Sequence, residues 1–112
     1  MRRSSYVPDR GDIVWLQFNP QAGHEQAGHR PALVLSPASY NRASGLMLCC
    51  PMTSQKKGYP FEVIINTAPG QTSVVLADQV KSLDWKVRKA VKKGTAPINV
   101  VEEALSKLQA LL

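Results

Sequence analysis

Five short apolar runs, separated by stretches that contain Gly, Pro, Asn or Ser, place the strongest constraint on how this chain folds. They cover residues 13–18, 32–36, 46–51, 61–65 and 74–77. Each run has the length of a β-strand, and regularly spaced short strands are typical of a small barrel or sandwich. In the first run Val14, Leu16 and Phe18 share one face of the expected strand, and the opposite face is also largely apolar. We therefore predict a mainly β domain in which this first strand is central.

A different periodicity begins at Asn99. The apolar residues that follow recur at helical spacing: Val100, Val101, Ala104, Leu105, Leu108, Leu111 and Leu112. Asn99 and Glu102 have the spacing of an N-cap residue and a carboxylate three positions later. We predict an amphipathic C-terminal helix, whose apolar stripe serves either core packing or an interface.

The length of 112 residues is that of one ordinary domain, so residues 1–112 are expected to form a single unit. No apolar run approaches the ~20 residues that span a bilayer, and the first residues lack an apolar signal core, which makes a cytoplasmic location the expectation. Cys49 and Cys50 are adjacent in an apolar run, so in a strand they point to opposite faces. We predict two buried or half-buried free thiols and no zinc site.

The net charge is +6, and six of the fourteen Lys and Arg residues lie within a short stretch: Lys81, Lys86, Arg88, Lys89, Lys92 and Lys93. Lys56 and Lys57 form a second small basic focus. This distribution favours a polyanionic partner. A basic face that only solubilises the protein is the alternative, because charge runs usually have that role.

Residues 19–30 have no apolar period and predict a long loop, yet three ionisable groups cluster near its end. These are Glu25, His29 and Arg30. Cleaving RNA without a metal requires a base for the 2'-hydroxyl, a cation for the phosphorane and an acid for the leaving 5'-oxygen. Arg30 suits the cationic role, since a guanidinium donates two parallel hydrogen bonds to phosphate oxygens. A surface ion pair between Arg30 and Glu25 is the plain alternative.

Four ordered blocks resemble the MazF/PemK family of toxin endoribonucleases, from about Tyr6 to about Thr95. They are Gly11-Asp12-Ile13-Val14, Glu25-Gln26-Ala27-Gly28-His29-Arg30-Pro31, Pro51-Met52-Thr53-Ser54 and Asp78-Gln79-Val80-Lys81-Ser82-Leu83-Asp84. The resemblance implies a small SH3-like barrel of the PemK/CcdB type with a C-terminal helix. It also implies a homodimer that needs no cofactor or metal, cleaves single-stranded messenger RNA at selected sequences, and is neutralised by an antitoxin with an acidic C-terminal segment.

By the same resemblance, Arg30 and Thr53 are the catalytic pair, and the products carry a 2',3'-cyclic phosphate and a 5'-hydroxyl. On sequence alone Thr53 reads as a turn residue. An arginine, whose ordinary pKa lies above about 12, is a poor general base. Our hypothesis is therefore that Glu25 accepts the 2'-hydroxyl proton or orients Arg30, with His29 as the reserve candidate.

Selective cleavage also needs groups that stack on bases and read their edges. The resemblance places Asp78 and Gln79 at the RNA-binding face. Phe18, His29, Lys56 and Asn41 are further candidates for RNA contacts. For Phe18, as for Trp85, burial in the core is an equally good interpretation, because aromatic side chains bury large areas.

Two other functions remain open from the sequence. A DNA gyrase inhibitor of the CcdB family would share the barrel and need no catalytic residues. Such chains act through a Trp near the C-terminal end, but residues 108–112 of this chain contain no Trp. A non-catalytic RNA-binding module would bind with a steep salt dependence and leave the RNA intact.

Overall fold

The computed structural model describes residues 6–18 and 28–112. In chain order its elements are β1 (Asp12–Gln17), β2 (His29–Val34), α1 (Ala38–Ser44), β3 (Leu46–Thr53), β4 (Glu62–Ala68), β5 (Gln71–Leu76), the 3-10 turn η1 (Ala77–Gln79), β6 (Lys81–Asp84), β7 (Val91–Thr95) and α2 (Ile98–Gln109). The five predicted apolar runs thus correspond to β1 to β5. α1 covers Ala38–Ser44, a stretch rich in polar residues, and ends at Gly45 in a left-handed conformation.

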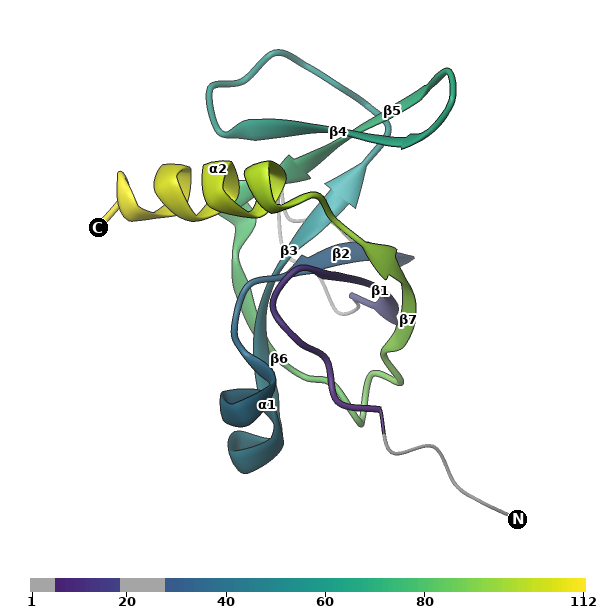
Figure 1. Cartoon of the computed structure of the whole chain (residues 1–112), viewed down its shortest axis with the longest axis vertical. Coiled ribbons are helices and arrows are strands. Elements are labelled where there is room, and N and C mark those ends of the chain that lie inside the picture. Colours follow the sequence, from purple (N-terminus) through teal and green to yellow (C-terminus); the bar gives the residue numbers. More distant parts are fainter. Residues whose placement is uncertain (1–5, 19–27) are drawn as a thin grey trace.

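All strand pairs are antiparallel, and the sheet order is β4-β5-β3-β2-β1-β7, with β6 also pairing with β3. β1 lies between β2 and β7, which confirms its predicted central position. The sheet curls into a half-barrel, with α2 beside β3 and β4 and α1 at the opposite end (Figure 1). The mainly β fold with a C-terminal helix is therefore confirmed.

The apolar side chains form two clusters that lie on the two faces of the curled sheet. One cluster contains Leu33, Cys50 and Met52 and packs against α2 through Val100, Val101 and Ala104. The other contains the residues of β1 that were predicted to share one face, together with alternate residues of β2 and β3. Its members are Val14, Leu16, Phe18, Ala32, Val34, Met47, Cys49, Leu83 and Trp85. Because side chains alternate along a strand, β2 and β3 each contribute residues to both clusters.

The predicted cap of the C-terminal helix is wrong, although the helix itself is confirmed. α2 begins at Ile98, so Asn99 lies within the first turn, and no side chain caps the helix start. Pro97 precedes the helix, and its carbonyl oxygen accepts hydrogen bonds from the amides of Val100 at 3.0 Å and Val101 at 3.3 Å. Proline suits the start of a helix, because its missing N–H group would have no partner there.

Cys49 and Cys50 are both free and buried, as predicted, and they belong to the two different clusters. Burial raises the pKa of each thiol to about 12, because the thiolate would lose its hydration. At neutral pH both residues are therefore uncharged packing residues of the core.

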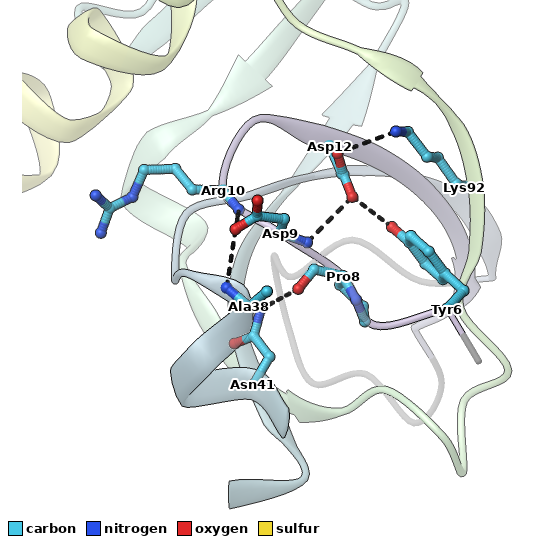
Figure 2. A network of polar contacts seen from close by, with 8 residues as sticks. All are labelled: Tyr6, Pro8, Asp9, Arg10, Asp12, Ala38, Asn41 and Lys92. Atoms are coloured by element: carbon cyan, nitrogen blue, oxygen red, sulfur yellow. Dashed lines mark hydrogen bonds and ion pairs between the residues drawn. The ribbon is translucent and has the colours of Figure 1, made fainter. Parts of the chain in front are cut away.

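The N-terminal segment is held against the sheet by a polar network (Figure 2). The Tyr6 hydroxyl donates to a carboxylate oxygen of Asp12 at 2.7 Å, and the Lys92 ammonium lies 3.6 Å from the other oxygen. The Asp9 amide also donates to Asp12, and the Asp9 carboxylate accepts from the Ala38 amide at 2.8 Å. Asp9 thus connects the segment before β1 to the first turn of α1.

Candidate active site

Arg30 lies on a strand and not in the long loop that the sequence predicted. β2 begins at His29, and Arg30 pairs with Leu16 of β1. The strand starts here because the backbone of residues 29 and 30 continues the β1–β2 ladder, although neither side chain is buried. Pairing of this kind depends on the backbone, so a polar sequence does not reveal it.

The β2–β3 register brings Arg30 and Thr53 to equivalent positions. The ladder between these strands ends at the pair Ala32 and Pro51. Arg30 lies two residues before Ala32, and Thr53 lies two residues after Pro51, which is the same direction in an antiparallel pair. Because side chains alternate with a period of two, Arg30 and Thr53 lie on the strand face of Ala32 and Pro51. Both residues are half-buried.

Thr53 closes β3 and pairs with Val74 of β5. Its hydroxyl oxygen accepts a hydrogen bond from the Gln55 amide at 3.2 Å, which fixes the turn after the strand. A hydroxyl has one hydrogen to donate besides its lone pairs, so this bond leaves the donor function of Thr53 for another acceptor. A threonine in this position can thus be both a turn residue and a phosphate ligand.

A cavity of about 350 Å³ joins Thr53 to Asp78 and Gln79. The two residues belong to η1, a single turn that follows β5 and presents Asp78 to solvent. The remaining lining residues come from the β3–β4 loop and the strands around it: Gln55, Lys57, Tyr59, Glu62 and Leu76. Three of the predicted site residues are therefore brought together in one polar cavity. Lys56 is exposed in the same loop, between two of the lining residues.

His29 lies on a different face from Arg30, its neighbour in the strand. Its Nδ1 atom accepts a hydrogen bond from the Trp15 indole N–H at 2.9 Å, and Lys93 lies 5.0 Å from the Trp15 ring centre. His29 and Trp15 line a second cavity of about 560 Å³ with Gln17, Val87, Arg88, Lys89 and Val91. The Arg88 guanidinium donates to the Gln17 carbonyl at 2.9 Å, so part of the basic stretch stabilises the end of β1.

Two of the predicted RNA contacts are wrong, because the structure buries both side chains. Phe18 is 2% exposed and belongs to the cluster of Val14 and Leu16, so it has no free face for a base. Asn41 is 0% exposed, and its amide nitrogen donates to the carbonyls of Pro8 and Ser36 at 2.7 and 3.0 Å. Figure 2 shows the contact with Pro8. Trp85, for which stacking was the alternative to burial, is 7% exposed and belongs to the core.

Glu25, the predicted base, lies outside the described residues. Within residues 6–18 and 28–112, no group of three or more His, Cys, Asp or Glu side chains is placed to hold a metal ion. In that part of the chain, no helix is both long and apolar enough to cross a membrane.

The sequence analysis did not predict five of the residues that line the cavity of Thr53, namely Gln55, Lys57, Tyr59, Glu62 and Leu76. Of these, only Lys57 had been noted, as part of a small basic focus. Glu62 is a carboxylate at the start of an apolar strand, and it is 8% exposed. This burial becomes visible only in the folded structure. A charged residue at such a position needs hydrogen-bond partners when it is buried.

Comparison with known proteins agrees with this geometry. The family model described as PemK-like, MazF-like toxin of type II toxin-antitoxin system matches residues 9–112. The endoribonuclease toxin MazF of Escherichia coli K12 is 50% identical over 109 residues, which cover 97% of each chain. The endoribonuclease toxin ChpB of the same strain is 42% identical and covers 93% of each chain.

Solved structures give the same result at the level of the fold. The crystal structure of MazF from Deinococcus radiodurans superposes with a TM-score of 0.89 and 57% identity, covering 96% of this chain and 97% of the other. A MazE-MazF structure from that organism gives a TM-score of 0.83, again at 57% identity, and covers 96% of each chain. The chain therefore belongs to the PemK-like, MazF-like toxins of type II toxin–antitoxin systems.

Proposed function

We propose that this toxin is a metal-independent endoribonuclease that cleaves single-stranded RNA at selected sequences and so inhibits translation and growth. The observation that carries the proposal is the placement of Arg30 and Thr53 at equivalent positions of β2 and β3, beyond the last pair of their ladder. The relatives at 50% and 42% identity are named endoribonuclease toxins. A gyrase inhibitor is not favoured by these relatives.

In the proposed reaction the 2'-hydroxyl of the substrate attacks the adjacent phosphorus, and the 5'-oxygen leaves. Arg30 donates two hydrogen bonds to the non-bridging oxygens, which carry extra charge in the transition state. The Thr53 hydroxyl donates a further bond to the same oxygens. The 5'-oxygen takes up a proton from solvent water as it leaves, so the products are a 2',3'-cyclic phosphate and a 5'-hydroxyl. Glu25 is proposed as the base that accepts the 2'-hydroxyl proton or as the residue that orients Arg30.

The cavity of Thr53 is proposed to hold a base next to the cleaved bond. Asp78 and Gln79 supply an acceptor and a mixed donor–acceptor group for the base edge, and Lys56 supplies charge for the backbone. The net charge of +6 attracts the substrate from a distance. His29 is proposed as a contact for the neighbouring nucleotide, with the Trp15 hydrogen bond holding its ring.

The proposed partners are a second copy of the chain and an antitoxin with an acidic C-terminal segment. Relatives have been crystallised as MazE-MazF complexes, and one of them is 57% identical to this chain. An acidic segment is complementary to a chain of charge +6 and would block phosphate access by covering Arg30. We propose that the toxin acts in the bacterial cytoplasm, where its RNA substrates are translated.

The test is incubation of the purified protein with a long RNA of known sequence in excess EDTA, followed by mapping of cut sites and end groups. Arg30→Ala is the inactive variant, and Arg42→Ala, which changes an exposed arginine of α1, is the matched control. We expect discrete cuts with 5'-hydroxyl ends from wild type and Arg42→Ala alone. Intact RNA, or cleavage that requires added Mg²⁺, would overturn the proposal.

A further inference from the structure

Glu62 is a buried carboxylate whose oxygens are directed at backbone amides. It is the first residue of β4 and is 8% exposed. Its Oε1 atom accepts from the Gly58 amide at 2.9 Å, and its Oε2 atom accepts from the Lys57 amide at 3.1 Å. A buried charge is tolerated only when such hydrogen bonds replace its hydration. Hydrogen bonds to a carboxylate are also about twice as strong as those between neutral groups.

The two amides belong to the loop between β3 and β4, which borders the cavity of Thr53. Lys57 lines this cavity, and so does Glu62 itself. Gly58 has a φ of +83°, a conformation that glycine adopts readily and that other residues rarely do. The carboxylate therefore selects one conformation of a basic loop at the edge of the proposed base pocket.

The end of this loop that leads into β4 is held by the C-terminal helix. The Lys107 ammonium of α2 donates hydrogen bonds to the backbone carbonyls of Pro60 and Glu62, the latter at 3.2 Å. Glu103, one helical turn earlier, lies 3.4 Å from the same ammonium and orients it. The loop is thus fixed in its middle by the Glu62 carboxylate, which accepts from two of its amides, and at its β4 end by the Lys107 ammonium, which donates to carbonyls.

We propose that Glu62 is a positioning residue for substrate, which holds Lys57 and the neighbouring loop residues against the RNA beside Thr53, and that Lys107 supports it from α2. This inference rests on the proposed endoribonuclease function. We assign Glu62 to positioning and not to proton transfer, because its side chain is buried and both of its oxygens already accept hydrogen bonds from backbone amides. Loss of its charge should therefore change the KM for RNA much more than kcat.

The test compares wild type with Glu62→Gln, Lys107→Met and the control Glu102→Gln, which changes an exposed carboxylate of α2. Glutamine keeps one acceptor oxygen but directs an NH₂ group at an amide that donates. We expect the amides of Lys57 and Gly58 to exchange with solvent about 10-fold faster in Glu62→Gln. The KM for a short cleavable RNA should rise about 10-fold, with kcat changed less than about 3-fold and its pH profile unchanged.

Lys107→Met should give the same changes at a smaller size, and Glu102→Gln should give none. Affinity for a non-cleavable RNA with a 2'-O-methyl group at the cut site should fall in parallel with the KM effect. If wild type cleaved RNA and Glu62→Gln changed neither the KM nor the amide exchange, the proposed function would stand and the inference about Glu62 would be overturned. An altered pH profile of kcat in this variant would also overturn it, by making Glu62 a catalytic group. A wild type that leaves RNA intact would instead refute the proposed function.

Discussion

Arg30 and Thr53 occupy equivalent positions on two neighbouring antiparallel strands, each two residues beyond the ladder pair of Ala32 and Pro51. At this point β3 changes partner, since Met52 and Thr53 pair with β5. The two polar side chains therefore mark the place where β3 leaves β2 for β5. A strand junction of this kind offers rigid backbone on both sides of a polar site, which favours transition-state stabilisation without reorganisation.

The first prediction concerns the size of the catalytic contributions proposed for Arg30 and Thr53. Arg30→Ala should lower kcat for RNA cleavage by about 100-fold or more, because removal of one preorganised donor to a developing anion has an effect of this size. Arg30→Lys should remain strongly impaired, since an ammonium does not reproduce the planar fork. Thr53→Val, which keeps the shape of the side chain, should lower kcat less, by about 10-fold. Single-turnover cleavage in EDTA measures each rate.

Thermal unfolding of the same variants is the control, because half-buried residues at strand ends should affect stability little. If Arg30→Ala lost folding together with activity, the rate effect would carry no information on catalysis. Equal kcat values for wild type and Arg30→Ala would refute its role as the cation of the reaction.

Much of the fold was predictable because most strands bury one or both faces. The alternation in β1 and the two adjacent cysteines of β3 indicated which residues face each side of the sheet. β6 and β7 were missed because both are short: Lys81–Asp84 has four residues with a single buried side chain, and Val91–Thr95 contains two lysines and is mostly exposed. Their strand conformation comes from pairing with β3 and β1, and such pairing leaves little trace in a hydrophobic pattern.

Residues of the candidate site could be predicted where a sequence motif falls at the end of a strand. A polar residue that stabilises the fold could not be told apart from them. Thr53, Asp78 and Gln79 share one cavity, whereas Asn41 was assigned to RNA because it is polar and lies in a polar segment. A side chain amide that is fully buried by long-range contacts looks, in sequence, like one on the surface. The Asn41 side chain donates to the carbonyl of Pro8, 33 residues away, and its backbone carbonyl accepts from the indole N–H of Trp85, 44 residues away.

The second prediction follows from that burial. Asn41→Ala should lower the free energy of unfolding by about 3 kcal/mol, because it leaves the Pro8 carbonyl and the Ser36 hydroxyl without their present partner. Urea denaturation measures the change, and Ser39→Ala at an exposed position of α1 is the control. A stable Asn41→Ala variant with weakened RNA binding would instead restore the original interpretation of this residue.

The third prediction concerns the reactivity of the cysteines. Both thiols are 0% exposed, and burial raises their pKa to about 12. A thiol reagent such as DTNB at pH 8 should therefore label the native protein only at the rate of its opening, and label both residues rapidly in urea. Ser39→Cys introduces an exposed thiol that should react at once. Rapid labelling of the native wild type would contradict the burial of both residues.

The same burial predicts a loss of stability in alkali. The pKa of each thiol is raised in the folded state from an ordinary value of 9.0. The contribution of each thiol to the free energy of unfolding is therefore fully present below pH 9 and is lost as the pH rises towards 12. The slope is at most about 1.4 kcal/mol per pH unit for each thiol. Burial and the Asp12 hydrogen bond also raise the pKa of Tyr6. Urea unfolding of wild type and of Cys49→Ala/Cys50→Ala between pH 8 and 11 isolates the thiol contribution, which should appear as a flatter curve for the variant.

The last prediction separates stability from function at Lys89, the non-glycine residue with a φ of 55° in the described part of the chain. Its amide donates to the Lys86 carbonyl at 3.0 Å in the turn between β6 and β7, so the backbone must keep this left-handed conformation. Lys89→Gly relieves the strain and should raise the free energy of unfolding by up to about 1 kcal/mol, whereas Lys89→Val should lower it by a similar amount.

Lys89→Gly should stabilise the protein, but loss of the Lys89 charge should weaken RNA binding. Lys89 lines the cavity of His29 and Trp15, so Lys89→Gly should weaken RNA binding and lower the salt slope of log K by about one unit. Lys89→Gln is the matched control, since it removes the same charge but retains the strained backbone. It should match Lys89→Gly in RNA affinity and wild type in stability. If Lys89→Gly bound RNA as tightly as wild type at every salt concentration, this lysine would contact no phosphate.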